Sequence, residues 1–207
     1  MDKRAHWEAV YTTKAADRVS WFQRSAEPSL KMIRASGIAK DDGIIDIGGG
    51  ASVLAAELLD AGFRDVSVLD IAEAALAASK ARLGPRASEV HWIVADILSW
   101  TPQRRFVLWH DRAVFHFLTD AQDRAAYRAV LERALEPGGN LILATFAPDG
   151  PERCSGLDVH RWSAEGLAAE LGAGFAPVES TNEAHVTPGG ATQHFIWCRF
   201  RRVGSVP

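Results

Sequence analysis

The sequence predicts an α/β fold with a single doubly wound, mostly parallel sheet of seven strands that ends in an antiparallel hairpin. Between residues 27 and 146, short apolar runs alternate with stretches of helical length, which is typical of repeated βα units. Acidic or polar residues follow several of these runs, where the carboxyl ends of parallel strands gather. Near the carboxyl terminus, two alternating segments flank Thr187-Pro188-Gly189-Gly190, a pattern that indicates a hairpin.

The elements follow in order, and glycine or proline marks most of their ends. Gly37, Gly62 and Gly84-Pro85 end three predicted helices, and Ser163 is expected to cap a later one. A turn at residues 137–139 is expected before the fifth strand. The predicted helices are 27–35, 52–61, 72–83, 120–135 and 163–171; the predicted strands are 43–47, 66–69, 90–94, 106–109, 140–146, 177–185 and 192–201, with a loop at 147–161.

The composition fits one globular domain. The chain has 207 residues, of which 47% are hydrophobic and 24% charged, enough to bury a substantial core. A net charge of −3 argues against a nucleic-acid partner. Cys154 and Cys198 form no disulfide framework and no metal motif. Because neither a signal peptide nor a run of roughly 18 apolar residues is visible, we expect a cytoplasmic protein without membrane contacts.

A glycine-rich turn after the first strand carries the most chemical information. Asp46 lies one residue before the end of that strand, glycines fill positions 48–50, and Ser52 opens the next helix. Glycines allow a backbone to approach a ligand closely. Asp70 and Asp96 follow the next two strands, so the three acids are expected at one edge of the sheet. The sequence therefore predicts a pocket for a nucleoside cofactor.

Val53 argues against a dinucleotide as this cofactor. In the dinucleotide fingerprint G-x-G-x-x-G/A, the last position must be small, and Val53 would crowd the helix against the strand. Asp46 is unfavourable beside a pyrophosphate but suits a cofactor with an amino group and no phosphate. S-adenosylmethionine has such an amino group, a cationic sulfonium and a ribose diol, whereas a nicotinamide oxidoreductase is a poor fit.

These residues, in this order, resemble the class I S-adenosylmethionine-dependent methyltransferase family, which has a Rossmann-like fold. The resemblance covers residues 40–146 and includes His110-Asp111-Arg112 after the fourth strand and the turn at 135–139. It implies that Asp70 holds the ribose hydroxyls and Asp96 the adenine amino group, with Ile71 and Ile97 against the adenine ring. The cofactor residues implied are Asp46, Gly48, Gly49, Gly50, Ser52, Asp70, Ile71, Asp96, Ile97 and His110; the product is S-adenosyl-L-homocysteine.

The amino-terminal segment fits two acceptor classes, and the residues after the fourth strand favour the small-molecule class. His6 to Tyr11 resembles the cap of a subgroup that contains small-molecule and protein-lysine methyltransferases. The lysine-directed members carry Asp-Lys-Gly after the fourth strand, where this chain has Asp111-Arg112-Ala113. We therefore expect a cap or lid at 1–37, a cofactor-binding core at 40–146 and a substrate-side region at 147–207. A protein-lysine methyltransferase and a non-catalytic cofactor-binding module remain the alternatives.

Candidates for the acceptor side follow the fourth and fifth strands or lie in the cap. An alcohol or ammonium acceptor needs a base, whereas a carboxylate or thiolate needs none. Asp111 could equally cap a helix, His116 could be packed between its Phe neighbours, and Cys154 could be an idle thiol. The candidates are His110, Asp111 and Arg112 for catalysis and Tyr11, Trp21, Phe22, Phe115, His116, Phe146, Cys154 and Arg161 for the substrate or lid. No metal is expected, and the chain is expected to be a monomer or a weak homodimer.

Overall fold

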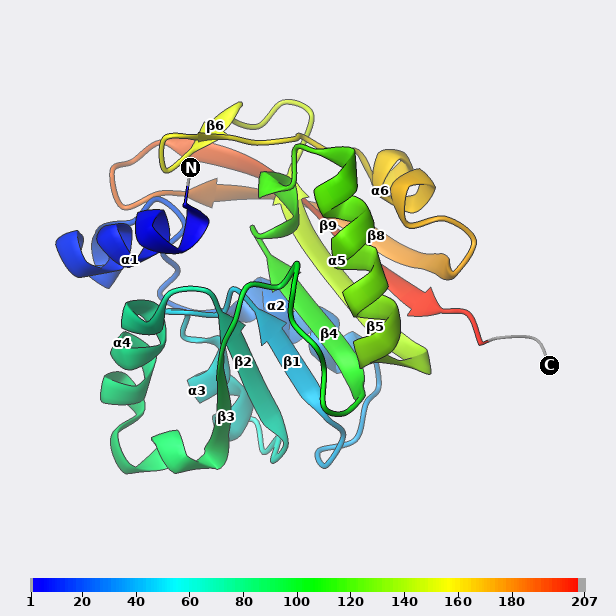
Figure 1. The fold of residues 1–207 in the computed structure, drawn as a ribbon, viewed down its shortest axis with the longest axis horizontal. Coiled ribbons are helices and arrows are strands. Elements are labelled where there is room, and N and C mark those ends of the chain that lie inside the picture. Colours follow the sequence, from blue (N-terminus) through cyan, green and yellow to red (C-terminus); the bar gives the residue numbers. More distant parts are fainter. Residues whose placement is uncertain (1, 205–207) are drawn as a thin grey trace.

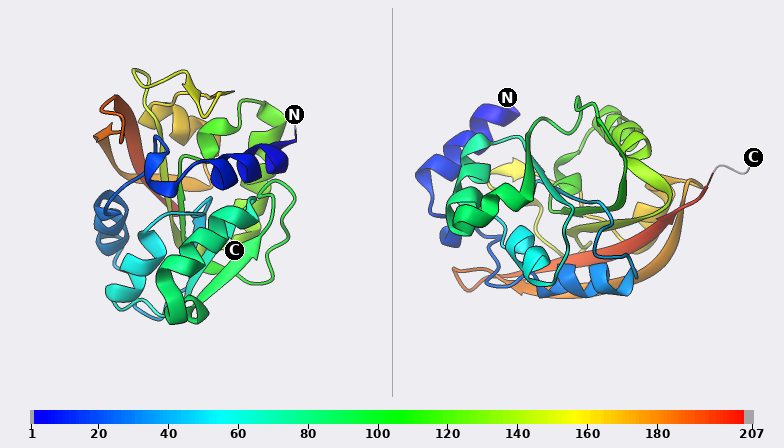
Figure 2. Two further views of the ribbon diagram at one scale, coloured as in Figure 1. Left: turned by 90° about the vertical axis from the view of Figure 1, so that its left-hand side faces the viewer. Right: turned by 90° about the horizontal axis from the view of Figure 1, so that it is seen from below.

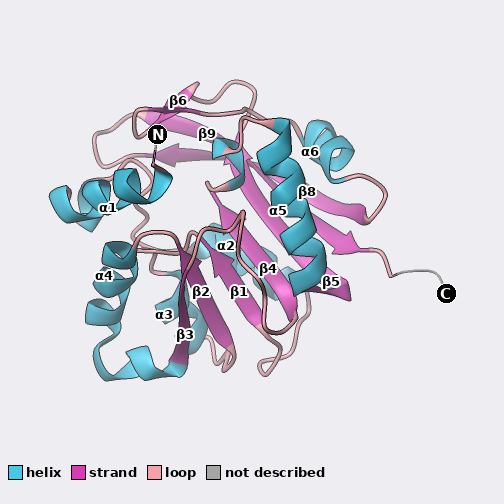
Figure 3. Ribbon diagram, viewed as in Figure 1, coloured by secondary structure: helices cyan, strands magenta, loops and turns pink. Residues whose placement is uncertain are grey.

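One seven-stranded sheet forms the centre of the computed structural model, which describes residues 2–204 without the side chain of Ala16. The strand order is β3-β2-β1-β4-β5-β9-β8 (Figures 1 and 3). Strands β1 to β5 are parallel, whereas β9 runs antiparallel to β5 and to β8, which confirms the predicted fold. The strands are β1 Ile44–Ile47, β2 Val66–Asp70, β3 Val90–Val94, β4 Phe106–Arg112, β5 Leu135–Phe146, β8 Phe175–Val186 and β9 Thr192–Arg202.

Helices cover both faces of the sheet (Figure 1). On one face, α5 (Ala121–Ala134) and α6 (Ala164–Leu171) pack on an apolar cluster that includes Trp109 of β4. On the other face, α2 (Glu27–Ala35), α3 (Leu54–Asp60) and α4 (Glu73–Leu83) share a cluster with Leu108. Successive residues of a strand face opposite sides, so β4 supplies apolar residues to both clusters. The strand order reverses between β1 and β4, where ligands bind in such sheets.

The amino-terminal helix lies across the carboxyl ends of the strands rather than on a face (Figure 2). This helix, α1 (Lys3–Thr13), is followed by a short 3-10 helix, η1 (Ala16–Arg18). The carboxylate of Glu8 accepts hydrogen bonds from the backbone N–H groups of Glu73 (2.6 Å) and Ala74 (3.1 Å) at the start of α4. Lys3 Nζ lies 2.6 Å from Asp123 Oδ2 on α5. These contacts hold α1 over the edge of the sheet at which the strands end.

The structure corrects three details of the sequence prediction. Strand β4 continues to Arg112, so residues 110–112 belong to the strand. Residues 136–139 interrupt the pairing inside β5, because Leu135 pairs with Phe106 and pairing resumes at Asn140. The predicted loop at 147–161 contains a small hairpin. Its strands are β6 Arg153–Cys154 and β7 Leu157–Asp158; the remaining 3-10 helices are η2 Gly84–Glu89 and η3 Phe115–Phe117.

The predicted capping residue of the last helix is confirmed. Ser163 Oγ accepts a hydrogen bond from the backbone N–H of Gly166 (3.0 Å), which satisfies one donor at the start of α6.

Candidate active site

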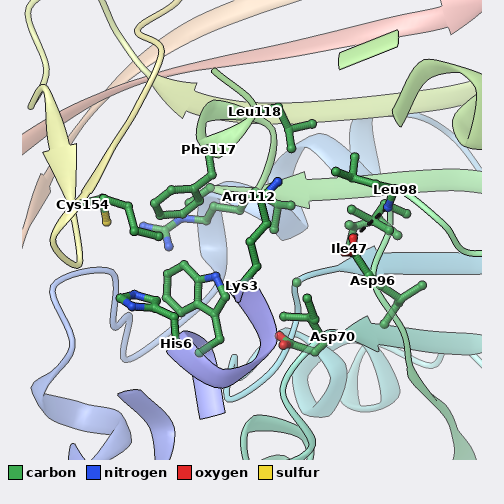
Figure 4. A pocket seen from close by; sticks show the side chains of 18 of the residues that line it. Lys3, His6, Ile47, Asp70, Asp96, Leu98, Arg112, Phe117, Leu118 and Cys154 are labelled. Carbon is green, nitrogen blue, oxygen red and sulfur yellow. Dashed lines mark hydrogen bonds between the residues drawn. The ribbon is translucent and has the colours of Figure 1, made fainter. Parts of the chain in front are cut away.

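A cavity of about 390 Å³ lies at the carboxyl ends of the parallel strands, beneath α1. Its volume is within the range of about 300–1,000 Å³ that is typical of small-molecule sites. Figure 4 shows two different ends: Asp70 and Asp96 mark one, and Arg112, Phe117 and Cys154 mark the other. We refer to these as the acidic end and the aromatic end.

At the acidic end, the backbone of each loop orients the carboxylate. Asp70 Oδ1 accepts a hydrogen bond from the N–H of Ala72 (2.8 Å), and Asp96 Oδ1 accepts one from the N–H of Leu98 (3.0 Å). Ile71 and Ile97 line the cavity beside them. Burial, together with the nearby Asp46 and Glu8 carboxylates, raises the pKa of the Asp70 carboxyl to about 7, although hydrogen bonds from the backbone of Ala72 and Ile71 oppose the shift. This end therefore presents hydrogen-bond acceptors between apolar walls.

The glycine turn after β1 leaves room for these carboxylates. Gly48 and Gly50 have φ angles of +65° and +24°, which favour glycine. A Cβ atom at Gly50 would lie 2.5 Å from Asp70 Oδ2. Gly48 lines both the large cavity and an adjoining pocket of about 50 Å³, which Gly49, Ser52 and Asp46 also line. The turn thus brings the backbone to the boundary between the two spaces.

His110 is held at both ring nitrogens. Its Nδ1 lies 2.7 Å from Asp46 Oδ1, and its Nε2 lies 3.0 Å from Ser29 Oγ on α2. The ring is 2% exposed and lines the small pocket, not the large cavity. In this arrangement, His110 fixes the orientation of the Asp46 carboxylate.

Asp111 faces away from both cavities because side chains alternate along β4. Its carboxylate is fully buried and accepts hydrogen bonds from the N–H groups of Val114 (2.9 Å) and Phe115 (3.3 Å) and from the Tyr127 hydroxyl (2.6 Å). Burial raises the pKa of Asp111 to about 6, and these hydrogen bonds oppose the shift. Asp111 therefore anchors the start of η3 to the core.

The aromatic end is assembled from segments that are distant in sequence. Trp7 of α1 contacts Trp21 and Phe117 edge-on, with ring centroids 5.7 and 5.1 Å apart. Tyr11, another residue of α1, stacks edge-on against Trp21 at 6.2 Å. Cys154 of β6 also lines this end, and burial raises the pKa of its thiol to about 11, so it is a neutral thiol at pH 7.

Five predicted substrate or lid residues lie outside the large cavity. Phe115, His116 and Phe146 are buried in the core. Burial, with the Arg112 charge, lowers the pKa of His116 to about 3, and its Nδ1 accepts a hydrogen bond from the N–H of Phe146 (3.3 Å). Phe22 lines only the small pocket, and Arg161 pairs at the surface with Glu152 (3.0 Å).

Sequence reasoning missed several residues that the structure brings to the cavity. Lys3 and His6 line it from α1, and His6 Nε2 is buried without a hydrogen-bond partner among residues 2–204. Lys3, His6 and Trp7 are spaced i, i+3 and i+4, so they share one helix face. That spacing is the signal from which they could have been identified. Ser29 of α2, which lines the small pocket, had no comparable signal.

Within the described chain, no group of three His, Cys, Asp or Glu residues could hold a metal ion. Nor does any helix in residues 2–204 have the length and apolar character to cross a membrane.

The comparisons with known proteins find the same fold in solved methyltransferases. An S-adenosylmethionine-dependent methyltransferase from Anabaena variabilis has a TM-score of 0.76 at 15% identity, covering 98% of this chain and 96% of that one. The 1,6-didemethyltoxoflavin-N1-methyltransferase of Burkholderia thailandensis, solved with S-adenosylhomocysteine, has a TM-score of 0.72 at 22% identity, covering 97% and 87%. The N-methyltransferase NodS of Bradyrhizobium japonicum has a TM-score of 0.66 at 20% identity, covering 85% and 86%. At these identities, the likeness shows the fold.

A family model described as a methyltransferase domain matches residues 44–139. A search of curated protein sequences found no match. The matched segment contains the glycine turn and the Asp46, Asp70 and Asp96 carboxylates. Residues 44–139 therefore resemble a methyltransferase domain, and the whole chain shares the fold of solved S-adenosylmethionine-dependent methyltransferases.

Proposed function

We propose that the protein transfers the methyl group of S-adenosylmethionine to a small-molecule acceptor. The observation that carries this proposal is the single cavity that joins the acidic end to the aromatic end beneath α1. One end suits a nucleoside, and the other offers an apolar space for a second molecule. A cavity shared by donor and acceptor is what a direct group transfer requires.

The residues of the acidic end fit the cofactor. Asp70 would accept hydrogen bonds from both ribose hydroxyls, and Asp96 would accept one from the adenine amino group. Ile71 and Ile97 would pack on the adenine ring. Asp46, fixed by His110, would face the ammonium group of the methionine part from the small pocket. A carboxylate is the complementary partner for each of these donors.

The cofactor supplies a methyl group that its sulfonium activates for in-line displacement. The chain contributes mainly alignment and the exclusion of water, and alignment alone is worth up to roughly 7–11 kcal/mol. Trp7, Trp21 and Phe117 surround the aromatic end, and aromatic faces attract cations such as a sulfonium. His110 and Asp111 do not line the large cavity, so neither is positioned as a base toward an acceptor there.

The aromatic end favours a small molecule over a protein lysine for two reasons. Helix α1 covers the cavity and supplies Lys3, His6 and Trp7 to its wall, which limits access by a folded protein. Arg112 adds a buried positive charge, which disfavours a lysine ammonium nearby.

Calorimetry and label transfer together test the proposal. We expect S-adenosylhomocysteine to bind and NAD not to bind; tight NAD binding without S-adenosylhomocysteine binding would refute it. Incubation with [methyl-³H]S-adenosylmethionine and a cell extract should label the low-mass fraction. A discrete labelled protein band would favour the lysine alternative instead, and binding without any transfer would favour a non-catalytic module.

A further inference from the structure

Arg112 presents an unused hydrogen-bonding edge at the aromatic end. Its Nη1 donates to the backbone oxygen of Trp21 (3.0 Å), and the guanidinium lies over the Phe195 ring, 4.8 Å from its centroid. Its Nε and Nη2 are buried and have no hydrogen-bond partner within residues 2–204. These two nitrogens form one edge of the planar guanidinium, the fork that binds a carboxylate through two parallel hydrogen bonds.

The acidic groups around Arg112 are already engaged. Glu183 accepts hydrogen bonds from Trp197 Nε1 (2.6 Å) and Gln23 Nε2 (3.3 Å), and Asp46 is paired with His110 (2.7 Å). Neither forms an ion pair with Arg112 in the described chain. Burial lowers the pKa of Arg112 to about 10, so it is still charged at neutral pH. A buried charge with two free donors is costly unless a ligand satisfies it.

The direction of the side chain separates this charge from the nucleoside end. Figure 4 shows Arg112 reaching past Phe117 toward Cys154, away from Asp70 and Asp96. Trp7, Trp21 and Phe117 form the apolar wall beside it. These rings flank the side chain, and Nε and Nη2 lie beneath the cavity wall, so an acidic group reaches them only by displacing the side chains that now cover them.

From this geometry we infer that the methyl acceptor carries a carboxylate-type acidic group on a flat apolar body, and that Arg112 binds this group through Nε and Nη2. The inference rests on the proposed function and specifies its substrate class. The rival source of a carboxylate is the methionine part of the cofactor, since Arg112 also lines the small pocket. If the cofactor supplies the carboxylate, loss of the fork should weaken cofactor binding. If the acceptor supplies it, cofactor affinity should be nearly unchanged.

The test begins with the wild-type protein and a cell extract divided by an anion-exchange resin. With [methyl-³H]S-adenosylmethionine, the salt eluate should support label transfer into low-mass product and the flow-through should not. Acceptor activity confined to the flow-through would overturn the inference. Failure of the wild-type protein to bind S-adenosylhomocysteine would instead refute the proposed function, which keeps the two failures distinct.

Variants then assign the role to Arg112. Arg112→Gln should raise the KM for the eluate acceptor at least tenfold while the affinity for S-adenosylhomocysteine changes less than threefold. Arg112→Lys keeps the charge but loses the fork, so its KM should lie between those of wild type and Arg112→Gln. It replaces Arg112→Gln in the test if that variant does not fold. Arg64→Gln, on the exposed pair with Asp41, is the matched control and should match wild type. A loss of S-adenosylhomocysteine affinity equal to the rise in KM would place the cofactor carboxylate on Arg112 and overturn the inference.

Discussion

The two ends of the large cavity are built in different ways. At the acidic end, each carboxylate is oriented by a backbone N–H two residues later, in Asp70–Ala72 and Asp96–Leu98. At the aromatic end, side chains from α1, β4, η3 and β6 meet although they are up to about 150 residues apart in the chain. The first end depends on local backbone geometry, whereas the second exists only when distant elements are docked. Perturbations of long-range docking should therefore affect the aromatic end more.

The largest effect is expected at Asp111, which ties η3 and its Phe117 to the core. Asp111→Ala leaves the N–H groups of Val114 and Phe115 and the Tyr127 hydroxyl without their acceptor, at about 1–3 kcal/mol per group. We expect the free energy of unfolding in urea to fall by about 3 kcal/mol or more. Asp111→Asn keeps one acceptor oxygen and should lose clearly less. Equal stability of wild type and both variants would show that Asp111 does not anchor η3.

The next effect concerns the acidic end. Asp70→Asn should weaken S-adenosylhomocysteine binding about tenfold, or about 1.4 kcal/mol, because an amide accepts less strongly from the ribose hydroxyls. Calorimetry measures this affinity, and Glu73→Gln, on an exposed carboxylate three residues later, is the control. Unchanged affinity in Asp70→Asn would remove Asp70 from the cofactor site.

The same variant should be more stable than wild type when no ligand is bound. The pKa of Asp70 is raised in the folded protein from 3.8 to about 7, so its contribution favours folding below pH 3.8 and is lost as the pH rises to about 7. Because asparagine does not ionise, Asp70→Asn should avoid this loss of folding free energy, which we place on the order of 2–4 kcal/mol. Thermal unfolding should show a higher Tm for the variant at pH 8 and a difference that shrinks toward pH 4. A constant difference across this range would contradict the buried-charge explanation.

The same contrast explains what the sequence could predict. The acidic end is visible in the sequence because strand, acid and turn are adjacent, as at Asp46, Asp70 and Asp96. The aromatic end is not, because it depends on how far β4 continues and where α1 docks. The predicted fourth strand ended at residue 109, so the sequence did not predict that side chains alternate across residues 110–112. In the structure, Asp111 faces the core and Arg112 faces the cavity. The fold followed from apolar periodicity, whereas the contacts of single side chains required the packed structure.

A smaller effect is expected from the contact that docks α1. Glu8→Ala removes the acceptor for the N–H groups of Glu73 and Ala74, a change comparable to loss of a helix cap at about 1 kcal/mol. Amide hydrogen exchange should become faster in α1 and remain unchanged in β1 and β2. Glu8→Gln retains an acceptor oxygen and should behave nearly as wild type. Equal exchange in α1 of wild type and Glu8→Ala would show that Glu8 does not hold the helix.

The smallest effect, on Cys154, reports whether that helix covers the aromatic end. Burial raises the pKa of Cys154 from 9.0 to about 11, which leaves about a hundredfold less thiolate, so iodoacetamide at pH 8 should react with it at least tenfold more slowly than with free cysteine. Glu8→Ala should accelerate this alkylation several-fold, measured by mass spectrometry. Cys198, buried in β9 away from the cavity, is the internal control and should be unaffected by the substitution. Faster alkylation of both cysteines would indicate general loosening of the fold. Faster alkylation of Cys154 alone would show that the docked α1 shields the aromatic end.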